Sequence, residues 1–349
     1  KTVMPVAQQG ASAGPAAPSA VSPPAVSPPA ESPPVAQPAP SVASKVERGP
    51  GGPAIITIDP SKKTAAPGVL VLRDPMRMQS DPRTAHLPDP DLIEKTPLGP
   101  LPKRGPDGLR PMDVYARPWS GARGPRVAIV IGGLGLSQTG TQAAIAALPG
   151  EVTLAFSPQG NSLQRWMQAA RQTGHEILMQ IPLEPFGYPQ LNPGRDTLLA
   201  GDEPAANLDR LHRSMARITN YTGVLNYMGA RFTADAAAME PVMADLAARG
   251  LLYLDDGSSA RSVADKVARD EGTPFAAADL VIDARQDKGE ILKKLDELER
   301  IARANGSAIG DGSAFDVTID AVDTWIKEAK LRGIEIVPVS ALVRDPEKQ

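Results

Sequence analysis

The sequence predicts an α/β fold whose main domain is a seven- to eight-stranded β/α barrel-like sheet. From residue 126 onward, short apolar runs rich in β-branched residues alternate with stretches of helical periodicity. Each strand and helix together take roughly 25–30 residues, and this alternation is typical of parallel strands joined by right-handed crossovers. Several helical stretches end in glycine, at Gly174, Gly250, Gly306 and Gly333, as left-handed helix stops do. An open doubly wound sheet is the alternative arrangement.

The apolar runs and the helical stretches give the expected order of elements along the chain. Strands are expected at 127–131, 152–156, 176–181, 223–227, 251–254, 280–282, 307–309 and 334–338. Helices are expected between them, at 138–147, 162–173, 204–219, 235–249, 263–270, 288–304 and 316–331. In either arrangement of the sheet, the residues that follow the strands meet at one rim, where such folds carry their functional groups.

Two further segments precede this domain, which is expected to span residues 126–343. Residues 1–45 consist almost wholly of Pro, Ala, Ser, Val and Gln with repeated Ser-Pro-Pro units, so we expect a disordered tether. The tether is either a spacer that carries the domain away from an anchor or simple low-complexity sequence. Residues 46–125 contain strand-like runs at 55–58 and 69–72 among many Pro, Gly and Asp residues, and are expected to form an extended arm packed on the domain.

The composition excludes several classes of site and partner. The formal net charge of −3 at pH 7 does not favour binding to nucleic acid or to an anionic membrane. The absence of cysteine excludes disulfides and thiolate metal sites, and it suits an oxidising periplasm. No apolar run is long enough to span a bilayer, and no signal-peptide pattern is present. Because the sequence begins with Lys1, we expect that an upstream segment has been removed, and membrane anchoring would come from it.

Polar side chains gather after several successive strands, at the rim that we call the mouth. The candidate substrate-binding residues are Gln180, Glu184, Asn226, Tyr227, Arg231, Asp255, Arg261 and Ser313. The candidate catalytic carboxylates are Glu184, Asp255, Asp256 and Asp311, with Asp283 beside them. Hydroxyls, amides and carboxylates next to an aromatic ring suit a sugar, which needs directional hydrogen bonds and a stacking surface. The alternative is that these residues cap helices and close turns.

Neither a nucleotide site nor a histidine-based site is expected at the mouth. The glycine-rich turn at 132–135 lacks both the spacing of a dinucleotide fingerprint and the lysine of a P-loop. The three histidines, His86, His175 and His212, all lie away from the carboxyl ends of the strands. A Ser-His-Asp arrangement is therefore excluded.

Short motifs follow one another in a defined order through the domain. They are VAIVI at 127–131 with LG at 134–135, GHE at 174–176, PLEP at 182–185 with GYP at 187–189, MGARFT at 228–233, LD at 254–255 with SARS at 259–262, GSAIG at 306–310 and VPVS at 337–340. In this order they resemble the divergent polysaccharide deacetylase family over residues 126–343. The segment from DGLRP at 107–111 to YARP at 115–118 is similar to that family's entry arm. The resemblance implies a β/α-barrel, carbohydrate-active fold of deacetylase type.

The catalytic site that the resemblance implies does not match the residues present. In the wider superfamily an Asp-Asp pair ends the first strand, as catalytic base and metal ligand, and histidines follow later strands. A divalent metal held there would polarise an acetyl carbonyl and activate water for amide hydrolysis. The matching positions in this chain are Gly132, Gly133, Gln180, Tyr227 and Ser313, which offer no ligand atom or a poor one. We therefore expect no zinc and no other cofactor.

Three functions stay open on the sequence. The motifs retain Glu184, Asn226, Arg231, Asp255 and Arg261, which fits a periplasmic or envelope-associated, membrane-tethered protein that engages a cell-envelope polysaccharide without the usual metal chemistry. A second function is an active carbohydrate hydrolase or deacetylase with a rebuilt carboxylate site, using magnesium, calcium or manganese, or no metal. A third is a non-catalytic envelope scaffold that acts through the arm and the tether.

Overall fold

The computed structural model describes residues 43–47, 55–59 and 84–348, in two units spanning Lys1–Val71 and Leu72–Gln349. In the first unit, β1 (Ala43–Glu47) pairs antiparallel with β2 (Ile55–Asp59). The strand β1 begins inside the segment that the sequence assigned to a disordered tether, because the β-branched run at 55–58 offers its backbone a partner. The rest of that tether, and the strand-like run at 69–72, lie outside the described residues.

The second unit is built on a nine-stranded sheet, and every strand pair in this sheet is parallel. Its strands are β5 (Arg126–Leu134), β6 (Thr153–Phe156), β7 (Ile177–Leu183), β8 (Gly223–Met228), β9 (Leu252–Asp255), β10 (Phe275–Ala277), β11 (Leu280–Val281), β12 (Ser307–Ser313) and β13 (Glu335–Ile336). Across the sheet the order is β10-β9-β8-β7-β6-β5-β12-β11, and β13 pairs with the start of β5. The predicted α/β fold with a curled, barrel-like parallel sheet is confirmed.

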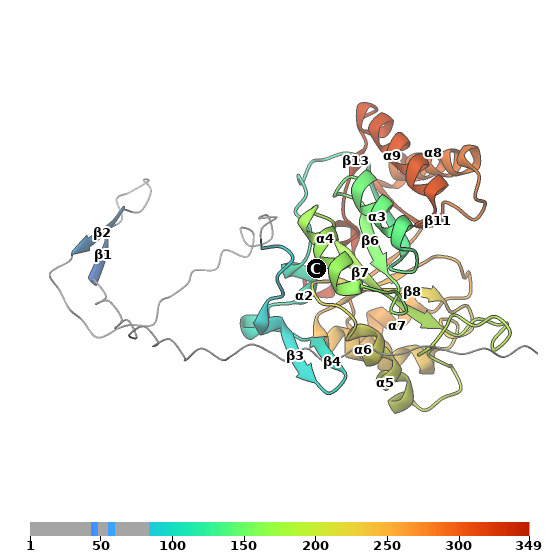
Figure 1. The fold of residues 1–349 in the computed structure, drawn as a ribbon, viewed down its shortest axis with the longest axis horizontal. Coiled ribbons are helices and arrows are strands. Elements are labelled where there is room, and N and C mark those ends of the chain that lie inside the picture. Colours follow the sequence, from blue (N-terminus) through green and yellow to red (C-terminus); the bar gives the residue numbers. More distant parts are fainter. Residues whose placement is uncertain (1–42, 48–54, 60–83, 349) are drawn as a thin grey trace, which may run out of the picture. The chain divides into compact units, whose positions relative to one another are not determined.

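Helices connect the strands and pack on the outer face of the sheet (Figure 1). They are α3 (Gln138–Ala147), α4 (Leu163–Gln172), α5 (Pro204–Met215), α6 (Ala236–Arg249), α7 (Ala264–Glu271), α8 (Lys288–Asn305) and α9 (Asp316–Leu331). The side chains of Ser137, Asp235 and Asp287 accept hydrogen bonds from the first turns of α3, α6 and α8. Gly250 and Gly306 end α6 and α8 in the left-handed conformation, as the sequence predicts.

Alternation along the strands separates two buried cores. On β5, Val127 and Ile129 face the helices, whereas Ala128 and Val130 face the interior of the curled sheet. The interior core consists of Met112, Ala128, Val130, Ala155, Leu178, Leu225, Leu252, Leu254, Ala276, Ala278, Ile309, Val337 and Val339. A tightly curled sheet leaves room for few side chains inside, which suits the alanines on three strands of this core and at Ala278.

The two edges of the sheet meet across one short segment. β10 pairs with β9, β11 pairs with β12, and only Ala278 and Asp279 separate β10 from β11. Ala278 N donates to Asp255 O at 2.8 Å, and Asp279 N donates to Ile309 O at 2.7 Å. This segment therefore closes the curl between β9 and β12. β10 is not among the strands that the sequence predicts, because its three residues, Phe-Ala-Ala, carry no alternating pattern.

The amino ends of the strands, which we call the base, are covered by the C-terminal segment 335–344. Val339 N donates to Thr153 Oγ1 at 3.1 Å beneath β6. Next to it, Ser340 donates to the carboxylate of Glu176 through both its backbone nitrogen, at 3.0 Å, and its hydroxyl, at 2.5 Å. The segment ends beside the outer edge of β10, where Arg344 N and O pair with the backbone of Phe275.

Residues 84–125 lie against this domain and form the described part of the predicted arm. They contain the antiparallel hairpin of β3 (Ile93–Thr96) and β4 (Gly99–Pro102) and the short helix α2 (Pro111–Val114). Leu92, Leu101 and Tyr115 are buried. The buried Arg110 guanidinium lies 2.5 Å from Asp345 Oδ2 and ties the arm to the C-terminal end. Single 3₁₀ turns complete the unit at Pro90–Leu92, Pro106–Gly108, Val339–Leu342 and Pro346–Lys348.

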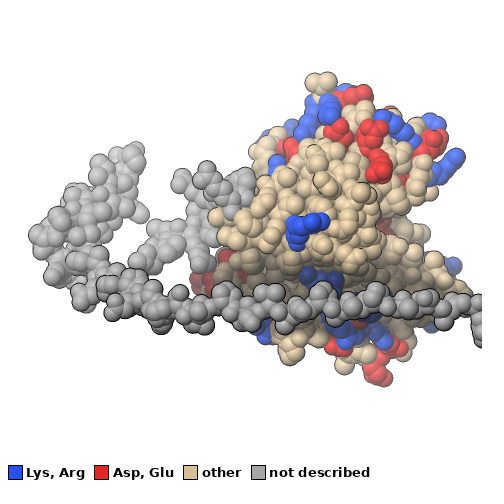
Figure 2. All heavy atoms as spheres, in the orientation of Figure 1, with Lys and Arg blue, Asp and Glu red and all other residues tan. Residues whose placement is uncertain are grey.

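Charged side chains of both signs interleave over α8 and α9 (Figure 2). Lys288 pairs with Asp320 between the two helices at 2.6 Å, and Lys327 pairs with Asp323 along α9 at 2.6 Å. The charges in this region therefore neutralise one another locally and form no patch of one sign. In the described ranges no helix combines the length and the apolar character that crossing a bilayer requires.

Candidate functional site

The inward alternation of the strands continues past the core to the mouth. Two positions beyond an interior core residue, each of four strands carries a polar or aromatic side chain: Gln180 after Leu178, Tyr227 after Leu225, Asp256 after Leu254 and Asp311 after Ile309. The register of β12 on β5 places Ser313 beside Gly132. Five of the residues that the sequence singled out therefore lie on the inner side of the mouth.

Gln180 occupies the space in front of the two glycines that end β5. Its Oε1 accepts a hydrogen bond from Gly133 N at 2.8 Å, and the side chain is 7% exposed. A Cβ atom on Gly132 would lie 2.6 Å from Gln180 Nε2, which is closer than such atoms approach one another. Gly133 has a φ of 78°, in the region that favours glycine. The glycines are therefore matched to the glutamine that packs against them.

An uncompensated carboxyl, Asp311, lies on β12 at the mouth. Its Oδ1 is buried and has no hydrogen-bond partner in the described part of the chain. Burial raises the pKa of Asp311 well above its ordinary value, and the nearby carboxyls of Asp256 and Asp283 raise it further. Burial also raises the pKa of Asp256 and of Asp283, against the hydrogen bonds that each carboxyl accepts. The mouth thus holds three carboxyls that resist ionisation together.

Both oxygens of Glu184 hold loops in place. Oε1 lies 2.8 Å from Arg231 Nη1, and Oε2 accepts a hydrogen bond from Ala200 N at 2.7 Å. The Glu184 side chain is 6% exposed, whereas that of Arg231 is 52% exposed. The buried carboxylate therefore fixes the long loop after β7 and the turn after β8, and neither oxygen is uncommitted.

Asp255 and Asn226 also fix loops, in agreement with the turn-and-cap alternative. Asp255 Oδ1 accepts from Gly257 N at 2.9 Å, and Oδ2 accepts from Ser262 Oγ at 2.5 Å. Asn226 Oδ1 accepts from Asp256 N at 2.9 Å, and Nδ2 donates to Met228 O at 2.7 Å. Asp255 stands one position away from the inward-facing Asp256 and so lies on the outer side of β9. These two residues shape the mouth without lining it.

Similarity to known proteins is consistent with this geometry. The family model for divergent polysaccharide deacetylases matches residues 129–343, which run from β5 to the C-terminal segment. The chain belongs to this family. The matched residues contain all the motifs from PLEP to VPVS and every residue of the mouth described above.

Three relatives of this family member are similar over more than half of its length. The crystal structure of an uncharacterized protein from Agrobacterium tumefaciens C58 has 66% sequence identity and a TM-score of 0.69, and the match covers 70% of this chain and 99% of that one. An uncharacterized protein from Haemophilus influenzae is 27% identical over 220 residues, which are 63% of this chain and 77% of its own length. The uncharacterized protein YibQ from Escherichia coli K12 is 25% identical over 207 residues, 58% of this chain and 63% of its own length.

Exposed aromatic side chains surround the mouth of this family member. Phe186 follows β7, Tyr227 lies near the end of β8 and Phe315 follows β12, with exposed fractions of 58%, 41% and 42%. The Arg261 guanidinium lies 5.7 Å from the centroid of the Phe186 ring. Sequence analysis named Tyr227 and Arg261 but missed Phe186 and Phe315. The available signal was their position shortly after a strand, which stands out because aromatic residues make up only 4% of this chain.

The side chains of metal-binding type are not arranged as a metal site in the residues that the structure describes. No group of three or more His, Cys, Asp or Glu side chains in these ranges is arranged to hold a metal ion. His175 is buried just before β7, with Nδ1 2.8 Å from Val152 O at the base. His212 lies on α5, with Nε2 3.0 Å from Asp245 Oδ2 on α6. Both histidines are structural in their contacts.

Proposed function

We propose that this family member binds a cell-envelope polysaccharide at its mouth and lacks the metal-dependent deacetylation for which its family is named. The observation that carries the proposal is the position of Gln180, which fills the space beside Gly132 and bonds to Gly133 N. A carboxylate at residue 132 would have to displace this buried side chain. The mouth is thus packed around a glutamine and two glycines, none of which supplies a strong ligand for a zinc-like ion.

The residues around the mouth support a sugar as the ligand. Gln180, Ser313 and the neutral form of a high-pKa carboxyl such as Asp311 all donate and accept hydrogen bonds, as sugar hydroxyls do. The ring of Tyr227, 41% exposed, offers a stacking surface at the same rim. A chain of sugar units uses both kinds of contact.

The cellular setting that we propose is the periplasm or envelope, with the barrel held near a membrane. The Pro/Ala/Ser-rich composition of residues 1–45 supports a spacer, and the absence of cysteine is compatible with an oxidising compartment. Fractionation of cells that express the full-length gene product tests this, and recovery in the cytosol would contradict it.

Metal content gives one test of the proposed chemistry. Protein purified without chelators should contain far less than one zinc per chain by elemental analysis. A matched variant, Gly132→Asp with Gly133→Asp and Gln180→His, restores the residue types of the wider superfamily. Zinc in the wild type at about one per chain, lost on Gln180→Ala, would overturn the proposal.

Glycan binding gives the more direct test. Replacement of Tyr227 by Ala should weaken binding of soluble peptidoglycan fragments about fivefold, because a stacked aromatic ring contributes roughly 1 kcal/mol. Tyr227→Phe keeps the ring and is the matched control, and it should bind nearly as tightly as the wild type. Thermal melts of the three proteins should coincide, since the Tyr227 side chain is 41% exposed. Equal binding by the wild type and Tyr227→Ala would contradict a sugar site at the mouth.

A second function is favoured by one observation, the raised pKa of Asp311. A carboxyl whose pKa is raised by burial holds its proton more tightly and can donate it to a leaving group, so a hydrolase with a rebuilt carboxylate site is the alternative. Of the carboxylates that the sequence named, Asp256 and Asp311 face the interior, whereas Glu184 and Asp255 are committed to loops. Release of acetate or reducing sugar from envelope glycans that is abolished by Asp311→Asn would establish this function in place of the first.

A further inference from the structure

A cavity lies at the base, at the opposite end of the barrel from the mouth. Its volume is about 630 Å³, in the range of pockets that hold small ligands. Its lining comes from segments at the amino ends of the strands, with Gly124 just before β5, Glu151 just before β6 and Glu335 on β13. Trp119 and Pro118 of the arm form another part of the lining. None of these residues belongs to the mouth.

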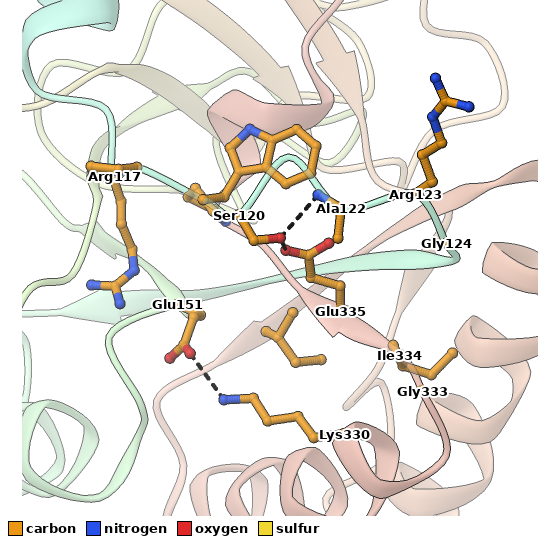
Figure 3. A pocket seen from close by; sticks show the side chains of 14 residues that line it. Arg117, Ser120, Ala122, Arg123, Gly124, Glu151, Lys330, Gly333, Ile334 and Glu335 are labelled. Carbon is orange, nitrogen blue, oxygen red and sulfur yellow. Dashed lines mark hydrogen bonds and ion pairs between the residues drawn. The ribbon is translucent and has the colours of Figure 1, made fainter. Parts of the chain in front are cut away.

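Glu335 presents an unsatisfied carboxylate oxygen in this cavity. Its Oε1 accepts a hydrogen bond from the Ser120 hydroxyl, which itself accepts from Ala122 N at 3.0 Å (Figure 3). The other oxygen, Oε2, is buried and has no partner in the described part of the chain. An unpaired buried acceptor is unfavourable by about 1–3 kcal/mol, so the cavity offers a place for a hydrogen-bond donor.

The cavity also offers an aromatic surface. Trp119 lines it and is 37% exposed, and the Arg126 guanidinium lies 5.5 Å from the centroid of its ring. The other two tryptophans of the chain, Trp166 and Trp325, are 7% and 1% exposed. An indole that stays this open in a protein with so few aromatic residues has a face available for a planar or polyhydroxylated ligand.

Charged side chains of both signs line the cavity, with Arg117, Arg123 and Lys330 against Glu151 and Glu335, so they largely neutralise one another. Lys330 Nζ lies 2.9 Å from Glu151 Oε1 across its floor, and Arg117 donates to Gly174 O at 2.7 Å with part of its guanidinium still directed at the cavity (Figure 3). A cation would meet Lys330 and Arg117, and an anion would meet Glu335. A neutral ligand whose groups both donate and accept hydrogen bonds satisfies all of them.

We propose that this base cavity is a second carbohydrate site, which takes one or two uncharged sugar units, with a sugar face on Trp119 and a sugar hydroxyl or N-acetyl N–H on Glu335 Oε2. The ligand class follows from the lining of the cavity itself, so the proposal goes beyond the mouth and does not require it. The two sites lie at opposite ends of the barrel, and a single short oligosaccharide does not reach both. Binding at the base therefore holds a polymer against the domain independently of the mouth.

The exposed tryptophan supplies the test. Because Trp166 and Trp325 are buried, quenching of intrinsic fluorescence by acrylamide reports mainly on Trp119. Neutral hexasaccharides, namely cellohexaose, maltohexaose and N-acetylchitohexaose, should be titrated into wild-type protein. At least one should protect the fluorescence from acrylamide. The same titrations on Tyr227→Ala should give the same protection, since that residue lies at the mouth.

Two variants locate the binding. Glu335→Gln keeps an oxygen for Ser120 but replaces the free acceptor, and it should weaken protection about tenfold, with an unchanged melting temperature. Trp119→Phe keeps an aromatic ring, so its affinity, measured by calorimetry, should fall less than that of Trp119→Ala, which should drop about fivefold.

Three results would overturn the proposal. In the first, none of the neutral hexasaccharides at millimolar concentration protects the fluorescence. In the second, the protection is unaffected by Glu335→Gln. In the third, only the deacetylated, cationic chitohexaose or a peptide of residues 18–36 gives protection. Protection lost in Tyr227→Ala but kept in Glu335→Gln would likewise refute the base site while leaving the mouth as the proposed glycan site. Protection at the base with no effect of Tyr227→Ala on total binding would instead count against the mouth.

Discussion

The mouth and the base of the barrel each contain a buried carboxyl group, and the two groups differ in the hydrogen bonds that they accept. At the base, burial raises the pKa of Glu176, but three donors converge on its two oxygens: Ser340 N and Arg117 N at 3.0 Å and the Ser340 hydroxyl at 2.5 Å. At the mouth, burial raises the pKa of Asp311, and its Oδ1 receives no hydrogen bond in the described residues.

The difference separates a carboxyl that stabilises the fold from one that does not. Glu176 links β7 to the arm and to the C-terminal segment, so its desolvation is offset by hydrogen bonds that join three parts of the chain. Asp311 is also desolvated, but its Oδ1 accepts no such bond in the described residues, and two neighbouring carboxyls raise its pKa further. Uncompensated groups of this kind are typical of places where a ligand completes the hydrogen bonding.

The largest expected effect on stability comes from a change at the base. Glu176→Gln should lower the free energy of unfolding by about 2–3 kcal/mol at pH 7, because the amide nitrogen that replaces one oxygen would face a donor. Urea unfolding measures this loss. Ser340→Ala removes only one of the donors and is the graded control, with a loss of about 1 kcal/mol. Unfolding of Glu176→Gln at the wild-type urea concentration would show that the base carboxyl is not structural.

At the mouth, replacement of Asp311 is expected to raise the free energy of unfolding. The folded-state pKa of Asp311 lies above its ordinary value of 3.8, so the folded state holds this proton more tightly than the unfolded chain. The stability that protonation provides is complete below that ordinary value and is lost as pH rises through the raised pKa. Asp311→Asn cannot ionise, so it should be about 1–2 kcal/mol more stable than the wild type at pH 8.

The pH dependence of the stability difference between Asp311→Asn and the wild type provides its own control. At pH 3.5 the wild type is protonated at Asp311, and the two proteins should melt together. Thermal melts from pH 3.5 to pH 8 should therefore show a gap that opens with pH. A gap of constant size, or an Asn variant less stable at pH 8, would mean that Asp311 is compensated after all.

A smaller effect on stability is expected from a change at Gly132, which tests the packing of the mouth. Gly132→Ala should be about 1 kcal/mol less stable than the wild type, because the new methyl group displaces Gln180 from its bond to Gly133 N. In a Gln180→Ala background the same change should have almost no effect. A double-mutant cycle measures this coupling. Additive effects of the two changes would show that Gln180 and Gly132 are not packed against each other.

The sequence predicts the sheet and its helices well because their signals are local. The expected helices at 138–147 and 316–331 coincide with α3 and α9, because apolar periodicity marks both and the N-cap Ser137 marks the start of α3. The strand β10 has no such signal, because its three residues are held in place by β9 and by the C-terminal segment. Pairing of this kind depends on residues that are distant in the sequence.

The mouth is predicted less completely, for the same physical reason. The motif positions identify which residues gather at the strand ends, but the side of the strand on which each one lies depends on the alternation, and loops interrupt it. Asp255 and Asp256 are neighbours in the sequence, yet only Asp256 faces the interior. Glu184 is of a residue type that is common in catalytic sites, but both of its carboxylate oxygens bind groups that hold loops in place. The cavity at the base carries no sequence motif, because it forms where the arm, β13 and the end of α9 meet.

The C-terminal segment has a consequence for biosynthesis. It closes the base by bonding to Thr153 and Glu176 and by reaching the backbone of Phe275, so residues from the beginning, middle and end of the domain depend on it. A nascent chain that has emerged only as far as α9 has every helix of the domain but an open base with its interior core uncovered. Completion of the barrel therefore waits until the last strand leaves the ribosome, and until then the parallel strands are the part of the chain most exposed to chaperones.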